Sequence, residues 1–283
     1  MLLITVLFAL LLIRIWGSGA PVQKDGWFFA IHEFFSEFEA LARRPCGTVM
    51  AAVIASLVAV YFVHSLLASI SGWFAALFAV VIFIYATGRG DWAVSARQYI
   101  SAWHGKDWAA ASVTAQELGV SAYDIDGDDW AELNHRLVAA LAYQGFERLF
   151  VILFWFCLGG VLPILAYRLI ALSRDETEDA DEEEQLSRVL WILEWPALRV
   201  FGLSLAITGN FSSCFARFKQ FLTDTTNSTQ QALVFFVESA LSVAEQEVQD
   251  PRFGERELRE ILHLYSRTTV LWVCVIALFA IFF

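Results

Sequence analysis

Long apolar runs separated by charged stretches constrain this chain more than any other feature of its sequence. A helix rises about 1.5 Å per residue, so it needs about 20 apolar residues to cross roughly 30 Å of hydrocarbon. Shorter runs reach that length by tilting or by including neutral flanking residues. Only 17% of the residues are charged, against about 25% in soluble domains. The chain is therefore an integral membrane protein, with spans expected near residues 2–16, 49–67, 73–86, 149–172, 197–209 and 268–283.

The expected fold is all-α: a polytopic helical membrane protein with five to six transmembrane helices plus amphipathic interfacial or cytoplasmic helices. No alternating strand pattern appears, and no Pro/Gly/Ser-rich linker divides the chain, so residues 1–283 are expected to form a single membrane domain. The run at 197–209 is short and contains Arg199, which leaves five crossings open. The small residues after Trp16 also allow a cleaved signal peptide, but no basic region precedes the first run, which favours a retained helix.

The distribution of Lys and Arg predicts the orientation. If all six runs cross, the segments 20–47, 89–148 and 210–267 share one side of the membrane and carry 14 Lys and Arg. The other side holds a tight turn near 69–72 and an acidic loop, 173–195, with Arg174 and Arg188. Basic loops stay in the cytoplasm, so we expect the charged loops to be cytoplasmic, with the acidic loop and both termini on the opposite, external side.

The charged segments also contain stripes of apolar residues at helical spacing. In 27–44, aromatic residues recur every three or four positions, and Glu33 and Glu37 occupy other sectors of the helix. Similar stripes run through 92–108, 130–146, 233–244 and 258–265. These helices either lie in the membrane interface, where aromatic rings accumulate, or pack on one another in the cytoplasm.

Several kinds of chemistry are not expected. The net charge of −11 argues against nucleic-acid binding. The four cysteines lie in or beside apolar runs without metal-ligand spacing, and no P-loop is present, so neither a metal nor a cofactor is predicted. The Asp-rich stretch from Asp124 lacks the glycine and glutamate of a calcium loop, and Asp128 or Asp129 is better explained as a helix cap. The acidic run 175–184 is typical of a solvated loop, although it could attract a divalent cation or a basic partner.

Polar residues at membrane depth are the strongest candidates for a functional site. Ionisable groups in a span are costly and tend to face protein or water. The predicted partner- or ligand-binding residues are Tyr167, Arg168, Glu194, Arg199 and Asn210. The alternative is that Arg168 and Arg199 reach to the headgroups, or pair with Glu194, and only fix the depth of the helices.

Two stretches resemble a known family. Residues 150–170 and 189–209 resemble the CobD/CbiB membrane proteins of cobalamin biosynthesis, and Trp195-Pro196 with residues 11–16 look more like the AmpE branch. The AmpE resemblance implies an inner-membrane protein that regulates β-lactamase expression and is linked to cell-wall recycling. The Gly-Arg-Asp-Thr and His-Pro-Ser-Pro-Asn-Ala-Gly blocks of the CobD/CbiB synthases are absent here.

The predicted function is noncatalytic signalling through binding of another membrane component. A partner protein with a single transmembrane helix fits, because Gly159, Gly160 and Gly202 allow close backbone approach. A homo-oligomer is also open. One alternative is a membrane-bound transferase related to adenosylcobinamide-phosphate synthase, with Glu117, Asp124, Asp126 and Asp128 as its acids. The other is a transporter, for which the break at Gly159–Pro163 would be required.

Overall fold

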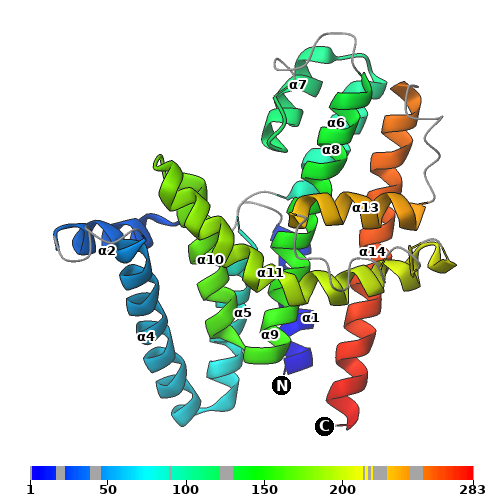
Figure 1. The fold of residues 1–283 in the computed structure, drawn as a ribbon. Coiled ribbons are helices and arrows are strands. Elements are labelled where there is room, and N and C mark those ends of the chain that lie inside the picture. The colour runs from blue at the N-terminus through cyan, green and yellow to red at the C-terminus, as the bar shows by residue number, and fades with distance from the viewer. Residues whose placement is uncertain are drawn as a thin grey trace. The chain divides into compact units, whose positions relative to one another are not determined.

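The computed structural model describes residues 2–16, 23–38, 46–88, 91–121, 130–212, 214–215, 218, 228–241 and 251–282. Regular secondary structure in this described part is helical throughout, with no strand, as predicted (Figure 1). The chain folds as two compact units, each assembled from separate segments. Unit 1 comprises residues 1–89, 151–195 and 279–283, and unit 2 comprises 90–150 and 196–278.

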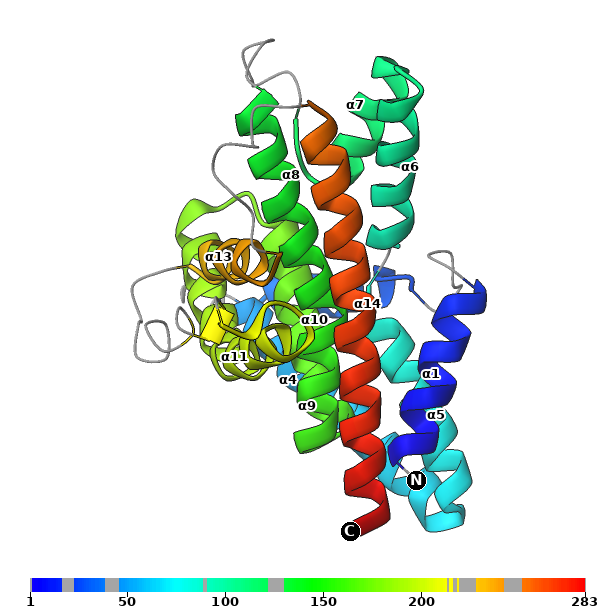
Figure 2. The same cartoon turned by 90° about the vertical axis from the view of Figure 1, so that its right-hand side faces the viewer.

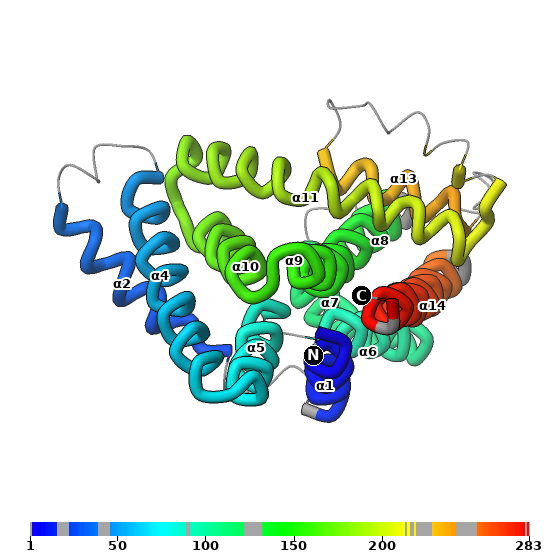
Figure 3. Tube along the Cα trace, turned by 90° about the horizontal axis from the view of Figure 1, so that it is seen from below, coloured from blue at the N-terminus to red at the C-terminus, as the bar shows by residue number. Residues whose placement is uncertain are grey.

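Unit 1 is built around one uncharged helix. It contains α1 (Leu2–Trp16), α2 (Gly26–Ser36), α4 (Gly47–Ile70), α5 (Gly72–Ala86), α9 (Ile152–Gly159), α10 (Val161–Glu176) and the first part of α11 (Ala180–Thr208). Helix α5 packs against α1, α4 and α10 (Figure 3). The turn between α4 and α5 is a single residue, Ser71, whose hydroxyl accepts a hydrogen bond from the backbone N–H of Trp73 and so caps α5.

The apolar run expected to cross once, 149–172, is instead a helical hairpin. Gly160 ends α9 with a φ of +71°, a value that residues with a Cβ rarely adopt. Pro163 lies in the first turn of α10, and a Cβ at Gly159 would be 2.7 Å from its Cγ. Helix α10 therefore runs back beside α9 (Figure 1). Hydropathy alone misses this turn because both arms of the hairpin are apolar.

The acidic start of α11 lies near the start of α4. The Cys46 thiol donates to the backbone oxygen of Glu182 across 3.7 Å. The start of α4 and the start of α11 therefore lie at the same end of unit 1. The side of the membrane on which each of the segments 20–47 and 173–195 lies stays a prediction.

Unit 2 contains the whole of α6 (Trp92–His104), α7 (Trp108–Glu117), α8 (Trp130–Gly145) and α13 (Thr229–Leu241). It also contains parts of three further helices: the π-helical segment η3 (Phe146–Val151) as far as Phe150, α11 after Trp195, and α14 (Pro251–Phe282) as far as Leu278. Aspartates begin two of these helices. The Asp91 carboxylate accepts from the N–H groups of Ala93 and Val94 at the start of α6, and the Asp107 carboxylate accepts from Ala110 at the start of α7.

Helices α8 and α14 pack parallel to each other. The Asn134 amide donates to Glu257 at 2.6 Å, and the Tyr265 hydroxyl donates to the Ala142 carbonyl at 2.8 Å. Further along, the rings of Phe150 and Trp272 are 5.7 Å apart. Residues later in the first helical segment thus contact residues later in α14, so the two helices are parallel. The amphipathic stripe at 258–265 and the span predicted at 268–283 thus belong to one continuous helix.

The second half of α11 and α13 lie side by side, crosswise to α8 and α14 (Figures 1 and 2). A Cβ at Gly202 would lie 3.0 Å from the Phe236 ring, which shows how closely the two helices approach. The Trp272 indole N–H donates to the Ser204 hydroxyl at 2.9 Å. The run predicted to cross the membrane at 197–209 therefore lies across a candidate span of its own unit.

Within the described residues, four helical segments are long and apolar enough to cross a membrane: Gly47–Ile70, Glu132–Gly159, Ala180–Thr208 and Gly254–Ala280. The helices Leu2–Ile15 and Gly72–Ala86 are apolar but shorter. These helices identify a membrane protein, while the number of five to six crossings stays a prediction.

Candidate functional site

Two neighbouring residues of α10, Tyr167 and Arg168, form polar links to two other segments of unit 1. The Tyr167 hydroxyl donates to Glu194 Oε1 at 2.8 Å, and the two residues are only 1% and 2% exposed. The Trp155 indole N–H donates to the carbonyl of Leu193 at 3.1 Å, so α9 also holds this part of α11. Glu194 is thus an internal anchor between helices, not a surface group.

Arg168 faces the start of α2. Its Nη2 lies 3.8 Å from Oδ2 of Asp25, the residue that precedes α2, and both side chains are mostly buried. The Tyr85 hydroxyl interacts with the same carboxylate. Beside them, the Gln23 amide donates to the carbonyl of Ile84 at 3.2 Å. The segment before α2 is therefore fastened to both α5 and α10.

Gly88 makes room for the Arg168 guanidinium. Its φ is +73°, and a Cβ there would lie 3.2 Å from Nη1 of Arg168. A side chain at this position would be strained in its backbone and crowded against the guanidinium. No sequence pattern indicates this arrangement, because Asp25 and Gly88 are both far from Arg168 along the chain.

The five predicted site residues divide between the two units. Tyr167, Arg168 and Glu194 belong to unit 1, where Tyr167 meets Glu194 and Arg168 meets Asp25. Arg199 and Asn210 belong to unit 2. Arg199 is half-buried on α11, and the Asn210 backbone N–H donates to the carbonyl of Ala240 at 2.9 Å. The structure adds Asp25, which the sequence reasoning missed.

The glycines expected to accept a partner helix are used within the chain. Gly159 is covered by Pro163, and Gly202 is covered by the Phe236 ring. Gly160 supplies the positive φ of the hairpin turn. Close packing at these positions is therefore explained by the chain's own fold, and it is not an indication of a partner.

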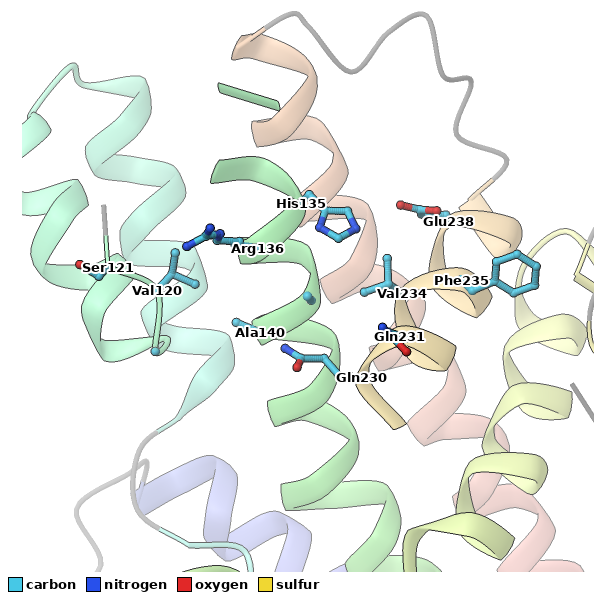
Figure 4. A pocket seen from close by; sticks show the side chains of 12 residues that line it. Val120, Ser121, His135, Arg136, Ala140, Gln230, Gln231, Val234, Phe235 and Glu238 are labelled. Carbon is cyan, nitrogen blue, oxygen red and sulfur yellow. The ribbon is translucent and has the colours of Figure 1, made fainter. Parts of the chain in front are cut away.

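Unit 2 has a cavity of about 770 Å³ between α8, α13 and residues 119–121 (Figure 4). His135, Arg136, Gln231 and Glu238 line it with both donors and acceptors, and its volume falls in the range of small-molecule sites, about 300–1,000 Å³. Arg136 is held by Glu132, one turn earlier, at 2.6 Å. Its mixed lining does not select one class of ligand.

The acids of the transferase alternative are only partly described. Glu117, at the end of α7, accepts a hydrogen bond from the Ser95 hydroxyl at 3.1 Å. Asp124, Asp126 and Asp128 lie outside the described residues, as does the helix cap expected there. Among the residues that the structure describes, no three or more His, Cys, Asp or Glu side chains are grouped as metal ligands.

A family model described as "Regulatory signalling modulator protein AmpE" matches residues 1–283. The chain belongs to the AmpE family. The match covers the helices of both units, so the α10 links and the unit 2 cavity lie within the AmpE region. It confirms the AmpE resemblance seen in the sequence, and with the apolar helices it identifies a regulatory membrane protein. No curated protein and no solved structure matches the chain.

Proposed function

We propose that this AmpE-family chain regulates signalling from the bacterial inner membrane by binding another membrane protein, without catalysing a reaction. The family description and the apolar helices support this proposal. The family resemblance points to β-lactamase induction and cell-wall recycling as the processes concerned. Kinship with the CobD/CbiB proteins is proposed for the fold alone, because their synthase motifs are missing from the sequence.

The observation that carries the proposal is the pair of polar links from adjacent residues of α10. Desolvating an ion pair is costly, and an apolar pair of similar volume often stabilises a protein equally well. The pair between Arg168 and Asp25 is therefore better explained by signalling than by stability. A displacement of α2 would act on Arg168, and the Tyr167–Glu194 hydrogen bond would pass it to α11.

Helix α2 offers the surface for the partner. It lies across the end of α4 (Figure 1). Trp27 and Phe34 on α2, and Phe38 just beyond its end, are large exposed aromatic residues. Aromatic rings are enriched both at the membrane interface and at the centres of protein interfaces. A partner bound to α2 would therefore contact the helix that begins directly after Asp25, the residue that pairs with Arg168.

The experiment places a photo-crosslinking amino acid at Phe34 in cells. As a matched position we choose Phe62 of α4, which is 67% exposed and lies among apolar residues. A protein adduct is expected at Phe34 and none at Phe62. The adduct should weaken when Arg168→Gln is added and persist with Arg188→Gln, a substitution in an exposed ion pair of the same unit. An adduct of equal yield at both positions, or none at Phe34, would refute the proposed surface.

We also propose a revised topology. The crossings are α1, α4, α5, the helix 132–159, α10 and α14, while residues 196–208 stay on the cytoplasmic side. Because α8 and α14 are parallel, they cross in the same direction, and α10 supplies the single return between them. A further crossing by 196–208 would reverse α14. Asp, Glu, Lys and Arg are absent from residues 46–88, 149–167 and 268–283. The turns at Ser71 and Gly160 are therefore on a side of the membrane without charged residues. The positive-inside rule assigns a side without basic residues to the periplasm.

Reporter fusions test this topology. Fusions at Ser71 and Gly160 should report a periplasmic location, and a fusion after Glu184 should report the cytoplasm. A periplasmic signal after Glu184 would restore the original expectation that 173–195 is an external loop.

A further inference from the structure

A second cavity of unit 2, separate from the one in Figure 4, lies between α6 and α14. Its volume is about 580 Å³. Four residues of each helix line it: Arg97, Ile100, Ser101 and His104 from α6, and Arg259, Leu262, His263 and Ser266 from α14.

The two helices present matching stripes to this groove. On each helix the four residues follow the spacing i, i+3, i+4, i+7, which places them on one face. Each stripe contains one Arg, one His, one Ser and one aliphatic residue. The helices run antiparallel, since Trp92 contacts Tyr265 at 5.6 Å near one end and His104 lies 3.4 Å from Glu255 near the other.

None of the described residues that line the groove is acidic, although the chain as a whole has a net charge of −11. Glu255 neutralises one end, where it pairs with Arg259 at 2.9 Å and meets His104. At the other end, the side chains of Arg97 and His263 and the hydroxyl of Ser266 make no ion pair or hydrogen bond within the part of the chain that the structure describes. Positive charge and hydrogen-bond donors are thus concentrated there.

This donor set suits a phosphoryl group. A guanidinium binds phosphate oxygens through two parallel N–H donors, and serine hydroxyls and an imidazole N–H add further donors. Ile100 and Leu262 give the groove an apolar floor. The uncharged stretch of α14, residues 268–282, begins two residues after Ser266. The groove therefore ends where α14 loses its charged residues. This is the depth at which lipid headgroups meet a spanning helix.

We propose that the groove between α6 and α14 is a binding site for a phosphate-bearing ligand, with Arg97, His263 and Ser266 holding the phosphoryl oxygens. The ligand is either a phospholipid headgroup or a free phosphate compound, which share this chemistry. The site is independent of the partner surface proposed on α2, because it uses other residues in the other unit.

The test uses the full chain purified into nanodiscs. One arm compares discs of phosphatidylcholine alone with discs that also contain phosphatidylglycerol, and native mass spectrometry reads the lipids retained on the protein. The other arm titrates inorganic phosphate into the phosphatidylcholine discs and follows the phosphorus NMR linewidth. The double variant Arg97→Gln/His263→Gln should lower affinity for the bound probe by about tenfold or more, as expected for lost charge-assisted contacts. Arg188→Gln, which also removes one positive charge, should leave the affinity unchanged.

The outcomes separate the two sources. Retained phosphatidylglycerol that is lost only in the double variant identifies a headgroup site, and variant-sensitive binding of inorganic phosphate in phosphatidylcholine discs identifies a site for free phosphate compounds. If neither probe distinguishes the double variant from Arg188→Gln, the inference is wrong. Arg97→Lys, which keeps the charge, guards against misfolding: it should retain measurable binding and an unchanged circular dichroism melt. Loss of binding by Arg188→Gln to the same extent as by the double variant would mean general charge attraction and would also overturn the site.

Discussion

The hydroxyl of Tyr167 donates a 2.8 Å hydrogen bond to Oε1 of Glu194, and both side chains are buried. The next residue along α10, Arg168, faces Asp25 instead. Successive residues on a helix point in directions about 100° apart, so α10 can be attached to α11 on one face and to the start of α2 on another. One short stretch of helix therefore couples two segments that are distant in sequence.

Tyr167→Phe should destabilise the protein by about 1–3 kcal/mol, because the substitution leaves a buried carboxylate oxygen without its donor. The measurement is thermal or denaturant unfolding of the purified protein in detergent. Tyr61→Phe is the matched control, since Tyr61 is 55% exposed on α4. Equal stability of the two variants would show that the Tyr167 hydroxyl contributes nothing to the fold.

Arg168→Leu should destabilise by about 3–5 kcal/mol, because it leaves the buried Asp25 carboxylate without its cation. Asp25→Asn should also destabilise, but the double variant should lose less than the sum of the single losses. Unfolding of the four proteins in a double-mutant cycle gives the coupling directly. Strictly additive losses would mean that the two charges do not interact, despite their separation of 3.8 Å.

Gly88→Ala should destabilise by about 1 kcal/mol or more, since the new Cβ meets both an unfavourable positive φ and the Arg168 guanidinium. Gly26→Ala is the comparison: Gly26 begins α2, and a Cβ there meets nothing within 4 Å. Unfolding midpoints of the two variants check the difference. A Gly88→Ala protein as stable as the Gly26→Ala protein would argue against the close approach of Arg168.

Cys46 should react slowly with maleimide. Burial raises the pKa of its thiol, and the nearby Glu182 and Asp179 carboxylates raise it further. Because the thiolate is the nucleophile, a raised pKa lowers its population at a given pH. Glu182→Gln removes one of the negative charges, so it should lower the pKa and speed labelling below that pKa, with the two rates converging at high pH.

Labelling is measured as a function of pH in a chain whose other three cysteines, Cys157, Cys214 and Cys274, are replaced by alanine. Identical pH profiles with and without Glu182→Gln would contradict an electrostatic influence of the acidic segment on Cys46.

Local sequence patterns predicted the helices well where a single helix accounts for an apolar run. The run at 2–16 coincides with α1, and the neighbouring runs at 49–67 and 73–86 lie within α4 and α5. The aromatic stripe predicted over 27–44 is helical as α2 as far as Ser36, and the stripe predicted over 92–108 is divided between α6 and the start of α7 at Trp108. Periodicity and hydropathy are local properties, so they identify such elements directly.

Two features could not be read from hydropathy. The break at Gly160 is hidden because both arms of its hairpin are apolar, and only the Gly-Gly pair followed by Pro163 signals a turn. Equally, Tyr167, Arg168 and Glu194 were found because polar groups stand out in apolar runs, whereas Asp25 lies in a charged segment where nothing distinguishes it. Its partner became evident only from the tertiary structure.

The parallel register of α8 and α14 has a consequence for biosynthesis. Tyr265 is 123 residues from the carbonyl of Ala142 that it binds, so the ribosome releases α8 well before its neighbour exists. Insertion of the earlier helices can proceed in order, but the face of α8 that Tyr265 covers stays open until α14 has been translated. Closure of unit 2 is thus a late, long-range step, and a nascent chain arrested before residue 251 should be the form most dependent on chaperones and most sensitive to quality-control proteases.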